Sequence, residues 1–242
     1  ILLPQQKLQG SGMNSYATYV SIADHNDFSF GDETNDSAFS VAAWVNLDVY
    51  ENMYIASKPD EWRFEISSTR YLTLILEDHL AFGGFLDAFL TGTATSTVTD
   101  GNVYHLAATF SGDSDEIVLY INGAAVGSNT VNTRSYVSMH NRSNALELYS
   151  NQYSNSNTLG EFAIYNSVLS ANTIAKMYNS GKVPDLLEVA PTNLIGYWRN
   201  SGNRIWQDLT SNNRDGTPTR ITNTSSRLAS ASISGGNKDY MG

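Results

Sequence analysis

The stretch VYHLAATFSGDSDEIVLYINGAAVGS, residues 103–128, decides the type of fold at the middle of the chain. Its first half alternates apolar and polar residues, as a half-buried strand does. Its second half holds Asn122 and Gly123 between two β-rich runs. Both central residues of a two-residue hairpin need a positive φ, which Asn and Gly tolerate. The stretch therefore predicts antiparallel strands joined by tight turns. The expected apolar face carries Tyr104, Leu106, Ala108 and Phe110.

Strand signals continue on both sides of this hairpin. In FSVAAWVNLD, the odd-numbered residues from Phe39 to Leu47 share one face, and Trp44 lies on the other. No alternation of strands with crossover helices is present. The pattern predicts an all-β protein, a two-sheet antiparallel sandwich or jelly roll. The other expected strands lie within residues 16–24, 61–67, 71–78, 144–151 and 160–166.

One short amphipathic helix is expected, in ANTIAKMYNS at residues 171–180. Ser170 has the side chain of an N-cap, and Gly181 can take the left-handed conformation that ends a helix. Ile174, Met177 and Tyr178 recur at helical spacing and form its apolar face. We expect the helix to cover one edge of a sheet.

The composition excludes several classes of partner. Fourteen Lys and Arg residues stand against 24 Asp and Glu residues, a formal net charge of −10. A chain this acidic is a poor ligand for nucleic acid or for an anionic membrane surface. Cysteine is absent, so there is no disulfide framework. The longest apolar runs are about five residues, far short of the roughly 20 that span a bilayer, so we expect no membrane insertion.

The chain is expected to have three parts. Residues 1–12 lack periodicity and are expected to form an extended N-terminal arm. Residues 13–185 hold the strand signals and are expected to form one jelly roll. Residues 186–242 form a C-terminal extension with Trp198 and Trp206. A strand containing a Trp is expected there, packed either on the jelly roll of its own chain or on a neighbouring molecule. Burial of the two tryptophans against the same chain distinguishes these alternatives.

Three segments resemble a laminin-G-like, or concanavalin A-like, jelly roll. Residues 15–48, SYATYVSIADHNDFSFGDETNDSAFSVAAWVNLD, resemble its opening strands. Residues 103–128 are similar to its central hairpin, with Tyr104 where Trp is usual and Asn122 where Asp is usual. Residues 159–182, LGEFAIYNSVLSANTIAKMYNSGK, resemble its closing strand and helix. The resemblance implies a two-sheet antiparallel jelly-roll sandwich with one short helix, to which the extended terminal arms are added.

A fourth segment resembles the same family but stands in an unusual place. NLIGYWRN and WQDLTSNNRDGT, within residues 193–217, are similar to an element that precedes the first strand in many members. Here the element follows the last strand of the jelly roll. This inverted order resembles structural proteins of tailed bacteriophages. The resemblance implies a non-catalytic virion protein, either a capsid decoration protein or part of a head or tail fibre.

We expect no enzymatic activity. Jelly-roll glycosidases, which the chain resembles in fold, place paired carboxylates at alternate positions of one strand, as acid and nucleophile. In EWRFE the pair is Glu61 and Glu65, whose Cα atoms a strand would separate by about 13 Å, too far for a retaining pair. The four histidines, at positions 25, 79, 105 and 140, form no metal-binding spacing.

The resemblance also implies a Ca²⁺ site, because laminin-G-like domains often hold this ion with Asp, Asn and backbone oxygens. Ca²⁺ takes about six to eight such oxygens. Their best source is the acidic loop ADHNDFSFGDETNDS at residues 23–37. The alternative is a solvated acidic loop with Asx-turns. The candidate ligands are Asn14, Asp24, Asp32, Asp36 and Glu161.

Glycan binding requires exposed aromatic rings with polar groups nearby for the sugar hydroxyls. Residues 147–158, ELYSNQYSNSNT, form the most site-like loop, although an ordinary long hairpin loop would have the same composition. Tyr50 and Tyr54 are also eligible. The alternative for every such residue is a place in the core of the sandwich. The candidates for glycan binding are Trp44, Trp62, Tyr149 and Tyr153.

Two functions follow as hypotheses, since fold alone does not choose between them. The first is a structural protein at the virion surface. Its partners would be other copies of itself, as in a trimer, other virion proteins, and cell-surface or mucus glycans. The second is a carbohydrate-binding module of a secreted, extracellular bacterial protein. A symmetric oligomer with shared termini favours the first, and Ca²⁺-dependent glycan binding by a monomer favours the second. A passive structural role without a ligand is the third alternative.

Overall fold

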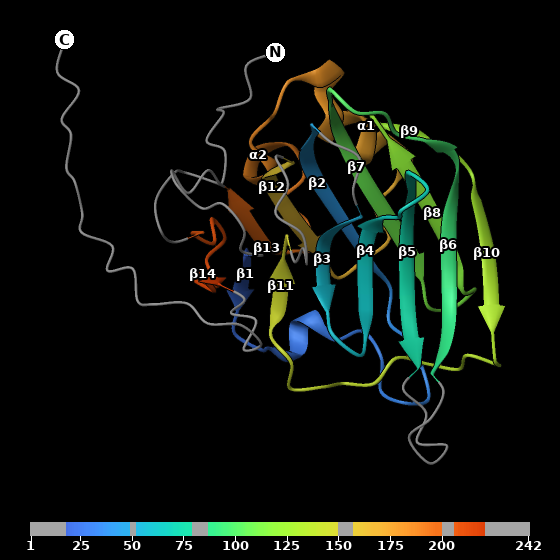
Figure 1. Ribbon diagram of the computed structural model, residues 1–242. Helices are drawn as coiled ribbons and strands as arrows, with labels where there is room; N and C mark the ends of the chain where they lie inside the picture. The colour runs from blue at the N-terminus through green and yellow to red at the C-terminus, as the bar shows by residue number, and fades with distance from the viewer. Residues whose placement is uncertain (1–17, 49–51, 79–86, 150–156, 200–205, 221–242) are drawn as a thin grey trace, which may run out of the picture.

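The computed structural model describes residues 18–48, 52–78, 87–149, 157–199 and 206–220. These residues fold into two sheets that stack face to face (Figure 1). All the strand pairs within the described ranges are antiparallel. The all-β, two-sheet jelly roll expected from the sequence is confirmed.

The larger sheet has eight strands in the described residues, and β3 to β6 lie side by side in front in Figure 1. Its central strands follow one another along the chain, whereas β1 and β14 pair at one edge although they come from opposite ends of the described chain. In spatial order the strands are β10 (Ser128–Thr133), β6 (Ala88–Thr97), β5 (Tyr71–Asp78), β4 (Trp62–Ile66), β3 (Met53–Lys58), β11 (Leu146–Leu148), β1 (Thr18–Ile22) and β14 (Gly216–Arg220).

The smaller sheet has six strands in the described residues, and its centre is formed by β12, β2 and β7. The hairpin from β8 to β9 is the two-residue turn predicted at Asn122 and Gly123, with φ of 51° and 79°. In spatial order the strands are β13 (Leu194–Arg199), β12 (Thr158–Tyr165), β2 (Phe39–Leu47), β7 (Asn102–Ser111), β8 (Glu116–Ile121) and β9 (Ala124–Ala125).

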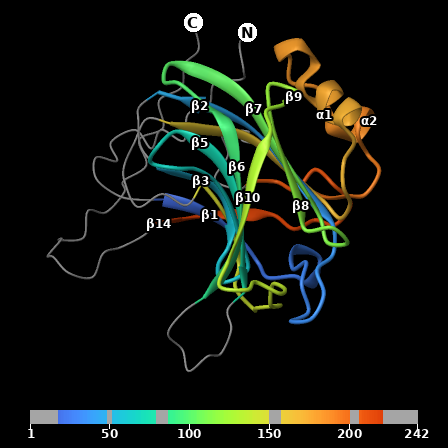
Figure 2. The same ribbon diagram turned by 90° about the vertical axis from the view of Figure 1, so that its right-hand side faces the viewer.

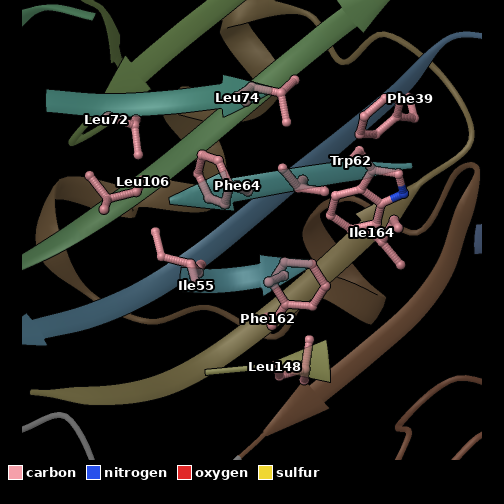
Figure 3. Close-up of a cluster of buried hydrophobic side chains, with 14 of the residues drawn as sticks. Phe39, Ile55, Trp62, Phe64, Leu72, Leu74, Leu106, Leu148, Phe162 and Ile164 are labelled. Carbon is pink, nitrogen blue, oxygen red and sulfur yellow. The ribbon is translucent and has the colours of Figure 1, made fainter. Parts of the chain in front are cut away.

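The main hydrophobic core lies between the two sheets (Figure 3). Alternation places every second side chain of the central strands there, as expected for Phe39 in β2 and for Leu106 in β7. Trp62 and Phe64 meet these residues from the larger sheet. Full burial of one such side chain stabilises the fold by about 1.5–3 kcal/mol. The apolar faces predicted for β2 and β7 are confirmed, and β4 and β5 are strands as expected.

Helices α1 (Ala171–Tyr178) and α2 (Leu186–Val189) lie against the outer face of the six-stranded sheet, on the side away from the larger sheet (Figure 2). The prediction that the helix would cover a sheet edge is therefore wrong. The reason is a row of small residues across three neighbouring strands, which lets α1 approach the sheet closely. Ile174 and Met177 of α1 are fully buried over it. The row runs Tyr197, Ala163, Ala42, Ala107 and Tyr120.

The ends of α1 show which local signals were used. The side chain of Ser170 accepts a hydrogen bond from Thr173 N at 3.1 Å, which confirms the predicted N-cap. The helix ends at Asn179, whose φ of 47° is left-handed, rather than at Gly181 as predicted. Asn is the residue that replaces glycine most readily in this position.

The segment after the helices completes both sheets of the same chain. Strand β13 pairs with β12 at the edge of the smaller sheet, and β14 pairs with β1 at the edge of the larger one. Trp198 and Trp206 are 0% and 1% exposed in the main core. Of the two alternatives for this segment, packing on its own jelly roll is therefore the one observed within the described residues.

Four strands of the larger sheet, β3, β6, β10 and β14, were not predicted. Two of them are poor in large apolar residues, because Gly92 and several Thr residues interrupt β6 and β10 is mostly polar. Pairing with neighbours, rather than local pattern, makes them strands. Among the described residues, no helix has the length and apolar character needed to cross a membrane.

Candidate functional site

The outer face of the eight-stranded sheet carries a patterned set of polar and aromatic side chains. Because successive residues of a strand point to opposite faces, the residues between the core positions of β3 to β6 point away from the core. Strand register aligns them in rows across the four strands. We call this set the polar face. It consists of Tyr54, Ser57, Arg63, Glu65, Thr73, Ile75, Glu77, Phe89, Thr91 and Thr93.

The register brings residues from distant parts of the chain side by side. One row runs from Ser57 through Arg63 and Ile75 to Thr91. The side chains at the centre of the face are little exposed, since Glu65 is only 8% exposed and Thr73 only 5%. The second row runs Tyr54, Glu65, Thr73 and Thr93.

Arg63 is held between two carboxylates of the polar face. Its Nη1 donates to Oε1 of Glu77, and its Nε lies 3.4 Å from Oε2 of Glu65. Its guanidinium carbon also lies 5.9 Å from the centre of the Phe89 ring. Burial raises the pKa of the Glu65 carboxyl, and the positive charge of Arg63 opposes that rise. The cluster is therefore a fixed arrangement of charges on adjacent strands.

The polar face can bind a hydroxyl-rich ligand but lacks a paired acid and base. Its threonines are hydrogen-bond donors and acceptors, and its carboxylates are acceptors. Both carboxylates of the cluster share one guanidinium, an arrangement unlike an acid and a nucleophile facing across a bond. Glu61, the other member of the pair considered from the sequence, is not available to Glu65. It is fully buried and pairs with Lys58 Nζ at 2.7 Å.

Two of the predicted Ca²⁺ ligands are paired with cations of the protein itself. Asp24 Oδ1 lies 2.9 Å from the fully buried ammonium of Lys58, which also contacts the backbone oxygen of Asn144 at 2.9 Å. Glu161 forms an ion pair with Arg199 and accepts a hydrogen bond from Tyr197 Oη at 2.8 Å. Amino and guanidinium groups thus lie where the sequence predicted a metal ion.

The other predicted ligands also have local partners. Asp36 accepts hydrogen bonds from Ser138 Oγ and Met139 N, both at 2.9 Å, and from the Tyr136 hydroxyl. Asp32 accepts from two backbone N–H groups of its own turn, which lowers the pKa of its carboxyl. Asn14 lies outside the described residues. No three His, Asp or Glu residues of the described ranges form a metal-binding group. Ca²⁺ binding stays a prediction.

The aromatic candidates are buried. Trp62 is 1% exposed and donates Nε1–H to Phe28 O at 2.9 Å within the core. Trp44 is 4% exposed on the outer face of the smaller sheet, with its ring stacked on Tyr178 of α1. Tyr149 is 6% exposed. None of the three presents a ring face to a ligand, because a sandwich uses its largest side chains to fill its layers. Tyr153 and Tyr50 lie outside the described residues.

The polar face was missed although its signal was present. In EWRFEI the residues between the core positions are charged, and in β6 threonines alternate with core residues at positions 91, 93 and 95. Tyr54 was eligible from the sequence and is half-buried on this face. The register that aligns these residues across four strands is a tertiary property, so the sequence pattern alone could not assemble them.

Comparison with known protein families identifies one match. The family model Laminin_G_3, described as the Concanavalin A-like lectin/glucanases superfamily, matches residues 14–175. This span includes the whole of the polar face. No curated protein matches the chain in sequence.

Two solved structures illustrate the similarity in fold. A putative carbohydrate binding protein from Bacteroides ovatus superposes with a TM-score of 0.52 at 15% identity. The match covers 86% of this chain and 60% of the other. The binding domain of Paraclostridial Mosquitocidal Protein 1 superposes with a TM-score of 0.50 at 14% identity, covering 66% of this chain and 40% of the other. At these identities the likeness shows the fold alone, and this chain spans less than two thirds of either structure.

Proposed function

The chain belongs to the concanavalin A-like lectin/glucanases superfamily, and from this premise we propose that its polar face is a non-catalytic glycan-binding surface. The observation that carries the proposal is the Arg63–Glu65–Glu77 cluster, aligned with rows of hydroxyl groups on the outer face of the larger sheet, over which no described helix lies. The similar structures contribute only the fold.

The chemistry of the face suits a sugar. Sugar rings present hydroxyl groups at their edges and C–H groups on their faces, so they need hydrogen-bonding partners beside an aromatic surface. Tyr54 lies opposite Glu65 in the register of β3 and β4, and Thr73 lies on the other side of Glu65. This places an aromatic ring, a carboxylate and a hydroxyl next to one another on rigid strands.

The positions of these groups are set before a ligand arrives. Glu65 and Glu77 are restrained by Arg63, and Thr73 and Ser57 are 5% and 7% exposed. Side chains that are already ordered lose little conformational entropy when a ligand binds. Because Arg63 restrains both carboxylates, the cluster orients hydrogen bonds rather than transferring protons, and we propose binding without catalysis.

The test is a screen of the full chain against an array of neutral and acidic oligosaccharides, followed by titration calorimetry with each hit. Tyr54→Ala should weaken binding about tenfold, which corresponds to about 1.4 kcal/mol. The matched control is Leu187→Ala, since Leu187 is 42% exposed on α2 and lies away from the polar face. The proposal fails if no glycan binds, or if Tyr54→Ala and Leu187→Ala bind as the unaltered chain does.

The virion role expected from the sequence stays a prediction. It rests on the inverted order of the element within residues 193–217, and the N-terminal arm and the end of the C-terminal extension lie outside the described residues. Glycan binding at the polar face is compatible with a protein at the virion surface and with a secreted carbohydrate-binding module. Light scattering of the purified full chain distinguishes the two, because a trimer favours the former and a monomer the latter.

A further inference from the structure

We infer that the polar face selects uncharged glycans and discriminates against sugars that carry a carboxylate, such as sialic and uronic acids. This inference rests on the proposed function and specifies its ligand class. Two independent features of the structure support it. The first is the sign of the charges on the polar face, and the second is the pairing of the Arg63 guanidinium with Glu65 and Glu77.

The charges on this side of the larger sheet are mostly negative. Among the residues of the polar face, Glu65 and Glu77 carry carboxylates, and Arg63 is the one cationic side chain. Two carboxylates against one guanidinium leave an excess of negative charge. The chain as a whole has the same sign, with a formal net charge of −10. A sugar carboxylate would therefore approach against like charge.

Arg63 is already engaged, although arginine is the residue best suited to bind a carboxylate. Such binding uses two parallel N–H groups of the guanidinium fork. Here Nη1 donates to Glu77, and the buried Nε lies 3.4 Å from Oε2 of Glu65 as an ion pair without a hydrogen bond. To turn its fork toward a ligand, Arg63 would have to leave these two little-exposed carboxylates without their counter-charge. Leaving a buried charge unpaired is strongly unfavourable.

An uncharged sugar meets none of these costs. Its hydroxyl groups can donate to Glu65 and Glu77, whose oxygens each accept more than one hydrogen bond. Its hydroxyl oxygens can accept from Thr91 and Thr93, which lie on the neighbouring strand β6. Donation to the carboxylates leaves the ion pairs of Arg63 in place. The same groups that bind a neutral sugar therefore repel an acidic one.

The experiment uses the full chain and pairs of oligosaccharides that differ only by a terminal sialic acid or by oxidation of one residue to a uronic acid. We expect the neutral member of each pair to bind at least about tenfold more tightly. Equal or tighter binding of the acidic members overturns the inference while leaving the proposed function intact. If no member of any pair binds, the proposed function fails and the inference fails with it.

A variant without the two carboxylate charges tests whether these charges cause the discrimination against acidic sugars. In a Glu65→Gln, Glu77→Gln double variant, Arg63 loses both counter-charges, and the discrimination should fall at least about threefold. Glu188→Gln makes the same chemical change at an exposed position on α2 and should leave the discrimination unaltered. Unchanged discrimination in the double variant overturns the inference. If the double variant does not fold, the same pairs are titrated against the unaltered chain at rising salt concentration. The preference for the neutral member must then shrink, because salt screens the charges of the polar face. A preference that does not depend on salt overturns the inference.

Discussion

The two sheets of this sandwich share one core, yet their outer faces have opposite compositions. Across the smaller sheet, the central outer row is Tyr, Ala, Ala, Ala, Tyr, and α1 covers it with Ile174 and Met177. Across the larger sheet, the corresponding row is Ser57, Arg63, Ile75 and Thr91, of which only Ile75 is apolar, and no described helix lies over it. One outer face forms a second core, and the other is the face that we propose for ligand binding.

The difference shows how one fold separates stability from binding. Small apolar residues permit close packing of a helix, which excludes water and stabilises the chain. Charged and hydroxyl-bearing residues gain little from such burial, but they offer directional hydrogen bonds to a partner from solution. Changes on the covered face should therefore alter the free energy of unfolding, and changes on the polar face should alter affinity.

The largest effect is expected from Ile174→Ala, on the covered face. Ile174 is fully buried between α1 and the sheet, so its truncation leaves a cavity. We expect a loss of about 2–5 kcal/mol in the free energy of unfolding, measured by urea denaturation. Glycan affinity of the folded variant should not change. If that affinity fell as it does in Tyr54→Ala, the two faces would not be independent.

An effect of intermediate size is expected at His105, which also lies on the covered face. Its ring packs beside Trp44, its Nδ1 has no hydrogen-bond partner, and burial lowers its pKa to about 3. The folded state therefore keeps this ring neutral, whereas the unfolded chain takes up a proton below about pH 6.5. The stability that the neutral ring contributes is complete above that pH. It is lost as the pH falls toward 3, by up to about 1.4 kcal/mol per pH unit.

Comparison with His105→Gln isolates this contribution, because the buried carboxyls titrate alike in both proteins. As the pH falls from 7 to about 4, the unaltered chain should lose more free energy of unfolding than the variant does. A difference between the two proteins that does not depend on pH would show that folding leaves the pKa of His105 unchanged, and that the covered face is less closed than its burial indicates.

The smallest effect on stability is expected from Thr91→Val, on the polar face. Thr91 is half-buried, and valine keeps its branched shape and its preference for strands. The free energy of unfolding should change by less than about 0.5 kcal/mol. The affinity for a glycan should nevertheless fall, since one hydrogen-bonding group is lost. A stability change as large as that of Ile174→Ala would contradict the contrast between the faces.

Much of the fold could be predicted because the signals are local. Alternation in β2 placed Phe39 in the core, and the Asn122-Gly123 pair located a hairpin. Local signals say less where a distant neighbour decides the surroundings of a side chain. The sequence does not reveal that Tyr178 of a distant helix stacks on the ring of Trp44, a candidate for glycan binding. Nor does it reveal that the buried ammonium of Lys58, in β3, lies 2.9 Å from Asp24, a candidate metal ligand.

The sequence by itself determined that the chain is an all-β sandwich with one capped helix, because period, turn residues and caps act over a few residues. The tertiary structure decided that the described helices cover the outer face of the smaller sheet and not that of the larger sheet. It also decided that the C-terminal tryptophans complete the sheets of their own chain, and that Arg63 lies between Glu65 and Glu77. These outcomes depend on strand order and register, which bring together residues that no local pattern relates.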